Sequence, residues 1–203
     1  MEASPITTIL SDVGGVLIKN YDATIDDVRM RVGLPEAIFL PIWQREVKIF
    51  GSYGDEARLW KAFAAQGGAT IEPDGSIFTS GFEDNLQIYH QVIEVMEQSG
   101  KTLSILSNTI PPHAKVLSNR GVYDAFDPQN VFLSHEIHEQ KPDLAAYAVA
   151  IEKLETNPEN ILFIDDSEAN LVTARRMGMQ TLLSAGDEPT IVASLTKILS
   201  RTA

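Results

Sequence analysis

The sequence contains no cysteine, no long apolar run and no excess of basic residues. Without cysteine, disulfide bonds and thiolate metal sites are excluded. No apolar run approaches the ~18 residues that a membrane-spanning helix needs, so a membrane is not an expected partner. The first residues, MEASPITTIL, also lack the basic start and apolar centre of a secretion signal. Together these absences predict a cytoplasmic protein.

The charge balance is acidic. The chain has 28 Asp and Glu against 16 Lys and Arg, which gives a formal net charge of −12. Nucleic acids and anionic membranes require a basic surface, so neither is an expected partner. A small anionic substrate remains compatible with this charge if a local cation or a metal ion offsets the field. The composition leaves the oligomeric state open.

The length and the apolar content predict a folded globular protein. The chain has 203 residues, of which 44% are hydrophobic and 22% charged. This suffices for one domain with a buried core, or for such a domain with a small insertion. Short apolar runs at residues 6–10, 102–106, 131–133, 161–164 and 180–184 are typical of buried strands. Helical periodicities at residues 86–96, 144–154 and 168–177 lie between them, so an α/β fold with a parallel sheet covered on both faces is predicted.

Residues from about 20 to 80 break this alternation, because their periodicity is helical and no strand pattern is convincing. Two apolar faces stand out in this segment, formed by Phe39, Trp43, Val47 and Phe50 and by Trp60, Phe63 and Ala64. We interpret these aromatic residues as a small core of the segment itself. A helical insertion directly after the first strand is expected to sit above the strand ends as a lid. The predicted division is a core of residues 1–18 and 82–203 and a cap of residues 19–81.

Polar residues follow three of the predicted strands, at Asp12, at residues 107–109 and at Asp165 and Asp166. Ligands of parallel α/β sheets bind beyond the carboxyl ends of the strands. Asp12 and Asp166 can share a hard cation such as Mg²⁺, and Asp12 can attack phosphorus to form an aspartyl phosphate. Each motif by itself also fits an ordinary turn or helix cap. Their common position at strand ends favours a phosphate-handling site.

Two further motifs supply what phosphoryl transfer needs beyond a nucleophile and a cation. The hydroxyl and amide groups of Ser107 and Asn108 suit phosphate oxygens. Lys141, in the motif QKPD, precedes a proline at a predicted helix start, which fixes its ammonium near the edge of the sheet. Phosphoryl transfer requires a nucleophile, a cation that spreads the charge, and donors to the equatorial oxygens of the phosphoryl group, and the sequence offers all three.

The motifs ILSDVGGVL, ILSNT, KPD and ILFIDDSEANLVTARRMGM occur in the order of the haloacid dehalogenase-like (HAD) hydrolase superfamily, which the chain resembles over nearly its whole length. The resemblance implies a Rossmann-like core with a helical cap inserted after the first strand. It implies that Asp12 is the nucleophile and a Mg²⁺ ligand, with the Gly14 carbonyl also facing the metal.

The remaining motifs carry further implied roles. By the same resemblance, Ser107 and Asn108 hold the phosphoryl group, and Lys141 stabilises the nucleophile and the transferring charge. Asp166 binds Mg²⁺ directly, and Asp165 lies beside it in a supporting or water-mediated role. The implied activity is that of a Mg²⁺-dependent phosphatase acting on a small phosphate ester.

Gly14 departs from the family pattern, since most phosphatases of this family have there an Asp that acts as general acid and base. Loss of positioned proton transfer typically removes ~10²–10⁴ in rate. A subgroup with an Asp-x-Gly-Gly first motif resembles this chain and includes an α-glucose-1-phosphate phosphatase. Sugar 1-phosphates and acyl phosphates have good leaving groups, which makes them the preferred substrate class.

Two other functions stay open. A phosphate- and metal-binding pseudoenzyme or regulatory module would keep the site without turnover, although retention of Asp12, Lys141 and Asp166 argues against it. A metal-free 2-haloacid dehalogenase also lacks the second Asp. Such enzymes do not, however, keep the pair of acids found here at Asp165 and Asp166, and two buried carboxylates without a cation are costly.

Several charged and titratable residues have no assigned role. His135 and His138 lie near Lys141, but the glutamates that alternate with them indicate a mobile polar loop. Arg45 and Lys48, on the polar side of the cap periodicity, either reach a second anionic group of a substrate or are solvated surface charges.

Overall fold

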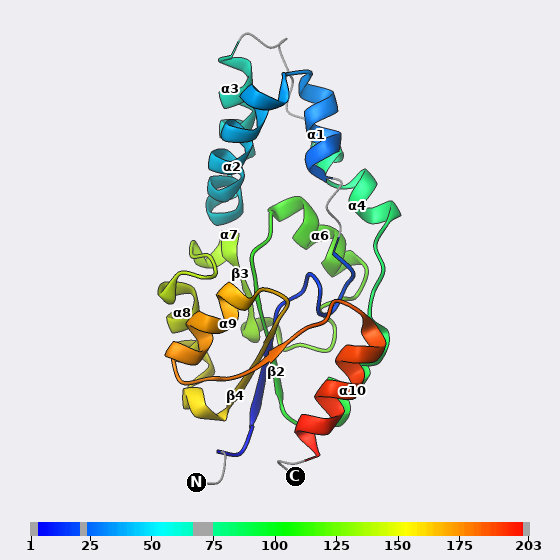
Figure 1. Ribbon diagram of the computed structural model, residues 1–203, viewed down its shortest axis with the longest axis vertical. Coiled ribbons are helices and arrows are strands. Elements are labelled where there is room, and N and C mark those ends of the chain that lie inside the picture. The colour runs from blue at the N-terminus through cyan, green and yellow to red at the C-terminus, as the bar shows by residue number, and fades with distance from the viewer. Residues whose placement is uncertain (1–3, 21–23, 67–74, 201–203) are drawn as a thin grey trace.

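The computed structural model describes residues 4–20, 24–66 and 75–200. They form a parallel sheet in the strand order β3-β2-β1-β4-β5 (Figure 1). The strands are β1 (Thr8–Ser11), β2 (Thr102–Ser107), β3 (Val131–Leu133), β4 (Ile161–Asp165) and β5 (Gln180–Leu183). Every predicted strand is therefore confirmed, with ends that differ by at most two residues.

Helices surround the sheet and the region above it. Those that follow β1 directly are α1 (Thr24–Val32), α2 (Glu36–Tyr53), α3 (Glu56–Ala64), the 3-10 turn η1 (Gly75–Phe78) and α4 (Ser80–Asp84). The others are α5 (His90–Gln98), α6 (Pro111–Asn119), α7 (Ser134–Ile137), α8 (Leu144–Leu154), α9 (Glu168–Arg176) and α10 (Glu188–Leu199), with the 3-10 turns η2 (Pro128–Asn130) and η3 (Pro158–Asn160).

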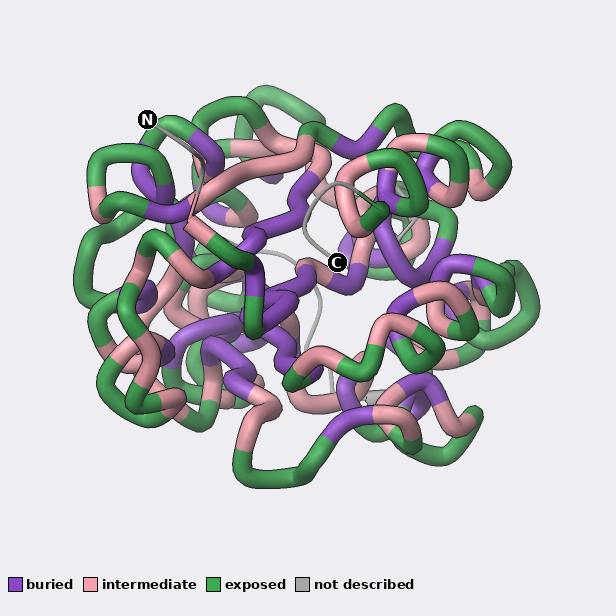
Figure 2. Tube along the Cα trace, turned by 90° about the horizontal axis from the view of Figure 1, so that it is seen from below, coloured by how far each residue is buried: buried purple, intermediate pink, exposed green. Residues whose placement is uncertain are grey.

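Both faces of the sheet are buried, as the continuous apolar character of the strands predicts. Ile9 and Leu10 are adjacent in β1, yet they belong to different apolar clusters because successive side chains point to opposite faces. The cluster around Ile9 includes residues of α5, α6 and α10, and the cluster around Leu10 includes residues of α8 and α9. Figure 2, seen from below, shows buried segments through the middle of the molecule and exposed segments around its rim.

One predicted helix begins later than its periodicity suggested. Residues 86–96 were expected to be helical throughout, but α5 begins at His90. Ile88 instead forms an antiparallel bridge with Ile18, and the Tyr89 N–H donates to the Leu17 carbonyl over 2.8 Å. The backbone of this segment therefore pairs with the chain that leaves β1, and this competes with helix formation.

The helices that follow β1 form a separate group above the carboxyl ends of the strands (Figure 1). Their apolar cluster contains Phe39, Phe50, Trp60 and Phe63, so the predicted aromatic core is confirmed. The rings of Phe39 and Phe63 stack with centroids 5.1 Å apart. Ala64, which shares a helical face with Trp60 and Phe63 in the sequence, is exposed.

The division between core and cap remains a prediction. Helix α4 spans the proposed boundary at residue 81, and its Phe82 packs into the cluster that covers the sheet. The cap therefore changes into the core within a helix, without an intervening linker at this point. Within the described residues, no helix is both long enough and apolar enough to cross a membrane.

Polar contacts join the end of α2 to the core. The Ser134 hydroxyl donates to the Gly51 carbonyl over 2.6 Å, and the Gln140 amide donates to the Lys48 carbonyl over 2.7 Å. The Nδ1 atom of His138 lies 2.9 Å from the Ser52 carbonyl oxygen, to which it donates as the N–H tautomer. The expectation of a mobile polar loop around His135 and His138 is therefore wrong, because these residues belong to α7 and its C-terminal cap and pack against α2.

Candidate functional site

The site begins with Asp12, which the central strand places at the carboxyl edge of the sheet. The Asp12 N–H donates to the Ile164 carbonyl over 2.8 Å, which continues the pairing of β1 with β4 by one residue. One oxygen of its side chain, Oδ1, accepts from the Val13 N–H over 2.7 Å and lies 2.8 Å from the Lys141 ammonium. The carboxylate is therefore held in a fixed orientation at the strand end.

Lys141 lies between two carboxylates. Its ammonium is 2.8 Å from Asp12 and 2.7 Å from Asp165, and only 1% of its side chain is exposed. Asn108 fixes the backbone of this lysine, since its amide oxygen accepts from the Lys141 N–H and its amide nitrogen donates to the Lys141 carbonyl. Asp12, Asn108 and Asp165 come from three separate motifs, and all three contact Lys141.

Asp165 and Asp166 are adjacent but have different surroundings. Asp165 is fully buried, and its carboxylate accepts from the Ser167 N–H, the Asn170 amide and the Lys141 ammonium. Asp166 is half-buried, and its Oδ2 accepts from the Asn20 amide over 2.6 Å. The carboxylate of Asp165 is therefore occupied by hydrogen bonds within the protein, whereas Asp166 faces the space between the strand ends and the residues after β1.

Carboxylate oxygens of Asp12, Asp165 and Asp166 all lie within 4.8 Å of one another. Three carboxylates and one ammonium give the cluster a formal surplus of negative charge. Burial raises the pKa of Asp12 to about 6; Lys141 opposes this increase and the charge of Asp165 adds to it. An additional cation would neutralise the surplus, because hard divalent cations prefer oxygen ligands of this kind.

The two glycines after Asp12 lie against neighbouring side chains. Gly15 has a φ of +68°, and a Cβ atom there would lie 2.5 Å from the carboxylate of Asp166. A Cβ atom on Gly14 would lie 2.7 Å from the amide oxygen of Asn20. Asn20 was not among the residues predicted from the sequence, because it lies eight residues after Asp12 and belongs to none of the motifs.

Ser107 ends β2 and is buried beside these groups. Lys48 and Arg45, the two cap residues that could have reached a second anionic group of a substrate, make other contacts. Lys48 is exposed, 3.8 Å from Asp143 at the start of α8. Arg45 is also exposed, and its guanidinium contacts the neighbouring Glu46, which is buried within the cap.

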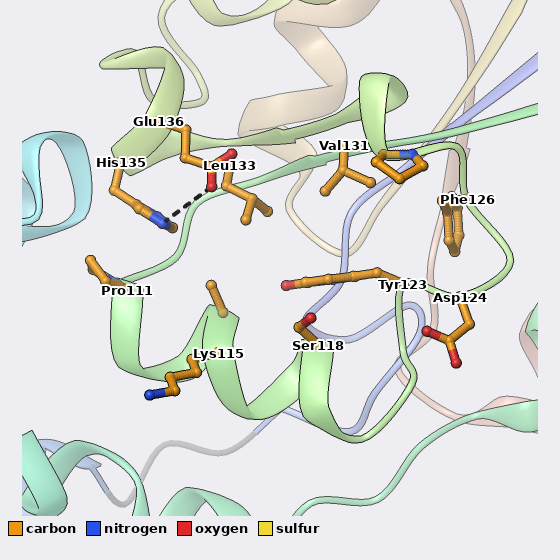
Figure 3. A pocket seen from close by; sticks show the side chains of 12 residues that line it. Pro111, Lys115, Ser118, Tyr123, Asp124, Phe126, Val131, Leu133, His135 and Glu136 are labelled. Carbon is orange, nitrogen blue, oxygen red and sulfur yellow. Dashed lines mark ion pairs between the residues drawn. The ribbon is translucent and has the colours of Figure 1, made fainter.

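A separate cavity of about 660 Å³ lies between α6, the edge strand β3 and α7 (Figure 3). The side chains of Tyr123 and His135 point into it from opposite sides. The Tyr123 hydroxyl and the Nδ1 atom of His135 are buried without a hydrogen-bond partner among the described residues. None of the strand-end acids lines this cavity, although the charge of Asp12 helps to raise the pKa of Tyr123, after burial and the charge of Glu136.

The fold and the site together define a Rossmann-like α/β protein with a helical cap above an acidic strand-end site. Residues 70–184 match the haloacid dehalogenase-like hydrolase family, and this match covers more than half of the chain. The chain belongs to this family of hydrolases.

Solved structures of HAD family members share the fold. The HAD family enzyme bt-2542 from Bacteroides thetaiotaomicron matches with a TM-score of 0.74 and 21% identity, over 93% of this chain and 98% of that chain. The same enzyme is known in complex with magnesium and inorganic phosphate. A predicted HAD-like family hydrolase from Porphyromonas gingivalis matches with a TM-score of 0.73 and 22% identity, over 97% of this chain and 98% of that chain.

A more distant structural relative is a dehalogenase. L-2-haloacid dehalogenase from Xanthobacter autotrophicus matches with a TM-score of 0.54 and 21% identity, over 87% of this chain and 76% of that chain. At these identities the structural likeness establishes the fold, and the reaction of this chain has to be argued from its own residues.

One curated relative is much longer than this chain. Drimenol cyclase drtB from Aspergillus calidoustus is 23% identical over 184 residues, which make up 88% of this chain and 34% of the relative. The chain therefore spans about a third of the length of the curated relative it matches.

Proposed function

We propose that the chain is a Mg²⁺-dependent phosphatase that acts on a small phosphorylated metabolite, preferably a sugar phosphate, through an aspartyl phosphate on Asp12. The observation that supports this most is the position of the buried Lys141 ammonium, within 2.8 Å of the carboxylates of both Asp12 and Asp165. This arrangement fixes a carboxylate nucleophile beside a cation that can stabilise the charge of a transferring phosphoryl group.

The side chains present fit a magnesium ion. Asp12 and Asp166 would hold it with their carboxylates, together with the Gly14 carbonyl, and Asp165 would support the site from beside them. The surplus of negative charge and the raised pKa of Asp12 support this assignment, because both would be relieved by a divalent cation. When bound, Mg²⁺ neutralises charge on the carboxylates and on phosphate oxygens.

Roles of the remaining residues follow from their contacts. Ser107 and Asn108 at the end of β2 would bind the phosphoryl oxygens. Asn108 already uses its amide oxygen and one amide N–H to hold the backbone of Lys141, which leaves a second N–H for a ligand. Asp165 would keep the Lys141 ammonium directed toward Asp12.

The reaction would proceed in two displacements at phosphorus. A carboxylate oxygen of Asp12 forms a bond to phosphorus while the leaving-group oxygen departs with the electron pair of the broken P–O bond. A water oxygen then forms a bond to phosphorus while the bond between phosphorus and Asp12 breaks, and the carboxylate keeps the electron pair of that bond. The water loses one proton to solvent, and inorganic phosphate leaves. Gly14 supplies no proton to the first leaving group, so leaving groups that depart without one are favoured. Sugar 1-phosphates and acyl phosphates meet this requirement.

A phosphate-release screen tests the proposal. Sugar phosphates, acyl phosphates and nucleotides are incubated with the protein and Mg²⁺, and with the Asp12→Asn variant. We expect release that is abolished by EDTA and that falls by at least about 10⁴-fold in Asp12→Asn, because the nucleophile is lost. Asp84→Asn, an exposed acid at the end of α4, is the matched control and should retain full activity.

Other outcomes would identify the alternatives. Chloride release from 2-chloropropionate in the absence of metal would favour a dehalogenase. Absence of turnover in both assays, with Mg²⁺ binding still measurable by calorimetry, would favour a pseudoenzyme or regulatory module. Either result would contradict the phosphatase proposal.

A further inference from the structure

The space above Gly14 is filled by a side chain from further along the sequence. A Cβ atom on Gly14 would lie 2.7 Å from the amide oxygen of Asn20 and 3.9 Å from its Cγ. Since Cβ atoms in proteins essentially never approach another heavy atom this closely, a side chain at residue 14 requires the Asn20 amide to move. The two positions therefore compete for one volume.

The other end of the same amide binds a proposed metal ligand. The Asn20 nitrogen donates to Oδ2 of Asp166 over 2.6 Å. An asparagine amide carries one acceptor oxygen and one donor nitrogen, so a single side chain can occupy the space at Gly14 and hold a carboxylate at the same time. An aspartate at residue 20 would have no donor for Asp166.

The backbone between the two residues folds to bring them together. The Gly15 N–H donates to the Ile18 carbonyl over 2.8 Å, and the Ile18 N–H donates to the Val13 carbonyl over 3.1 Å. The Lys19 N–H then donates to the Gln87 carbonyl over 2.9 Å. These bonds direct the chain back over the first motif immediately before Asn20.

We propose that Asn20 is a positioning residue that orients the Asp166 carboxylate for metal binding and occupies the volume which a larger residue at position 14 would need. This inference rests on the proposed magnesium site. It explains Gly14 as one half of a pair, because a larger residue there has to shift the amide that binds Asp166. Gain of an acid at position 14 would then come at the expense of the orientation of Asp166.

The first test measures Mg²⁺ affinity by isothermal calorimetry, without any turnover. Removal of groups that orient metal ligands typically costs 10–100-fold in metal affinity. We expect Asn20→Ala to weaken Mg²⁺ binding by about tenfold. The matched control is Asn85→Ala, which removes another exposed asparagine whose amide donates to a backbone carbonyl, that of Gly81, and it should leave the affinity unchanged.

The second test uses the predicted competition. Gly14→Ala adds only a Cβ atom, and it is expected to displace the Asn20 amide and to weaken Mg²⁺ binding as much as Asn20→Ala does. The double variant should then lose about tenfold in total, not the ~100-fold that independent effects would give. Thermal melting of each variant in EDTA verifies that it is folded.

The outcomes separate this inference from the proposed function. Unchanged Mg²⁺ affinity in Asn20→Ala, or losses that multiply in the double variant, would overturn the role of Asn20. Absence of Mg²⁺ binding by the unmodified protein would overturn the proposed magnesium site itself, and the inference with it. Coupled losses of affinity in a protein without phosphatase activity would support the inference while contradicting the activity.

Discussion

The core and the cap each contain one buried charge that lies between two charges of the opposite sign, and the two groups have opposite compositions. In the core, the Lys141 ammonium lies between the carboxylates of Asp12 and Asp165. In the cap, the carboxylate of Glu46 lies between two guanidinium groups, 2.6 Å from that of Arg45 and 2.8 Å from that of Arg58. The core group has a surplus of acids, and the cap group has a surplus of bases.

The pKa values of Glu46 and Asp12 are shifted in opposite directions. Hydrogen bonds from Arg58 and then Arg45 hold the pKa of Glu46 below its ordinary value, so this acid is ionised and fully paired. Burial holds the pKa of Asp12 above its ordinary value in spite of the neighbouring Lys141. Burial of a charge therefore does not distinguish a site from a structural ion pair. A buried acid whose pKa stays raised in spite of its protein partners is the better indication of a cation-binding site.

Removal of the Lys141 charge should reduce the stability of the protein more than removal of the Glu46 charge. Lys141→Met leaves Asp12 and Asp165 buried without their shared cation, and we expect the free energy of unfolding in EDTA to fall by about 3–5 kcal/mol. Mg²⁺ should stabilise both proteins because it binds only the folded site, and it should stabilise the variant more because the acids of the variant lack the ammonium. Urea denaturation with and without Mg²⁺ measures both effects, and a lack of stabilisation by Mg²⁺ in both proteins would contradict a metal site at these acids.

The same substitution should also reduce activity. Loss of one positioned donor to a transferring group typically costs about 10²–10³ in kcat, and we expect a decrease of this size in phosphate release by Lys141→Met. Lys197→Met removes an exposed lysine of α10 and is the matched control. Equal activity of the two variants would remove Lys141 from the proposed chemistry.

A buried histidine provides a third case beside the buried charges of the core and the cap, since the causes of its pKa shift include no acid. His113 of α6 stacks on Phe82, and burial lowers its pKa to about 4 from the ordinary value of 6.5, although a hydrogen bond to the Phe78 backbone opposes this shift. The unfolded chain therefore binds more protons between pH 4 and 6.5, so stability should fall as the pH is lowered through this range, by roughly 2–3 kcal/mol.

Denaturation of His113→Phe across this pH range measures the contribution. Phenylalanine retains an aromatic ring against Phe82 but has no titratable group, so the stability of the variant should depend less steeply on pH between 4 and 6.5. Curves that remain parallel for the two proteins would show that other groups cause the acid sensitivity.

Disruption of the cap charges should have the smallest effect. Glu46→Gln keeps the shape of the side chain and removes its charge, while both arginines remain largely exposed to water. We expect Tm to fall by about 2–4 °C, the shift that a loss of about 1 kcal/mol gives in a chain of this size. Phosphate release at a temperature well below Tm should be unchanged, and a large loss of activity would instead place the cap charges in substrate binding.

The sequence predicted the strands and the proximity of Asp12, Asp165 and Asp166, because buried strands are continuous apolar runs and their ends meet at one edge of the sheet. It did not predict Asn20. This residue lies in an irregular segment, where no periodicity links it to Gly14 or Asp166. Its proposed role depends on a reversal of the backbone, which tertiary hydrogen bonds produce.

Glu46 shows a different kind of omission, since a signal was present. It lies seven residues after Phe39 and four before Phe50, on the buried face of α2. A charged residue at such a position is rarely buried without a partner. The periodicity therefore indicated a buried acid, but the partner Arg58 comes from the next helix and only the tertiary structure identifies it.

The end of α2 has a consequence for unfolding. Its Gly51 and Ser52 carbonyls lie in the last turn and accept from Ser134 and His138, so side chains of the core satisfy carbonyls that a helix terminus commonly leaves to solvent. The Lys48 carbonyl, one turn earlier, accepts from Gln140. Separation of cap and core would leave these groups without their partners. We therefore expect both parts to melt in a single cooperative transition, with equal calorimetric and van't Hoff enthalpies.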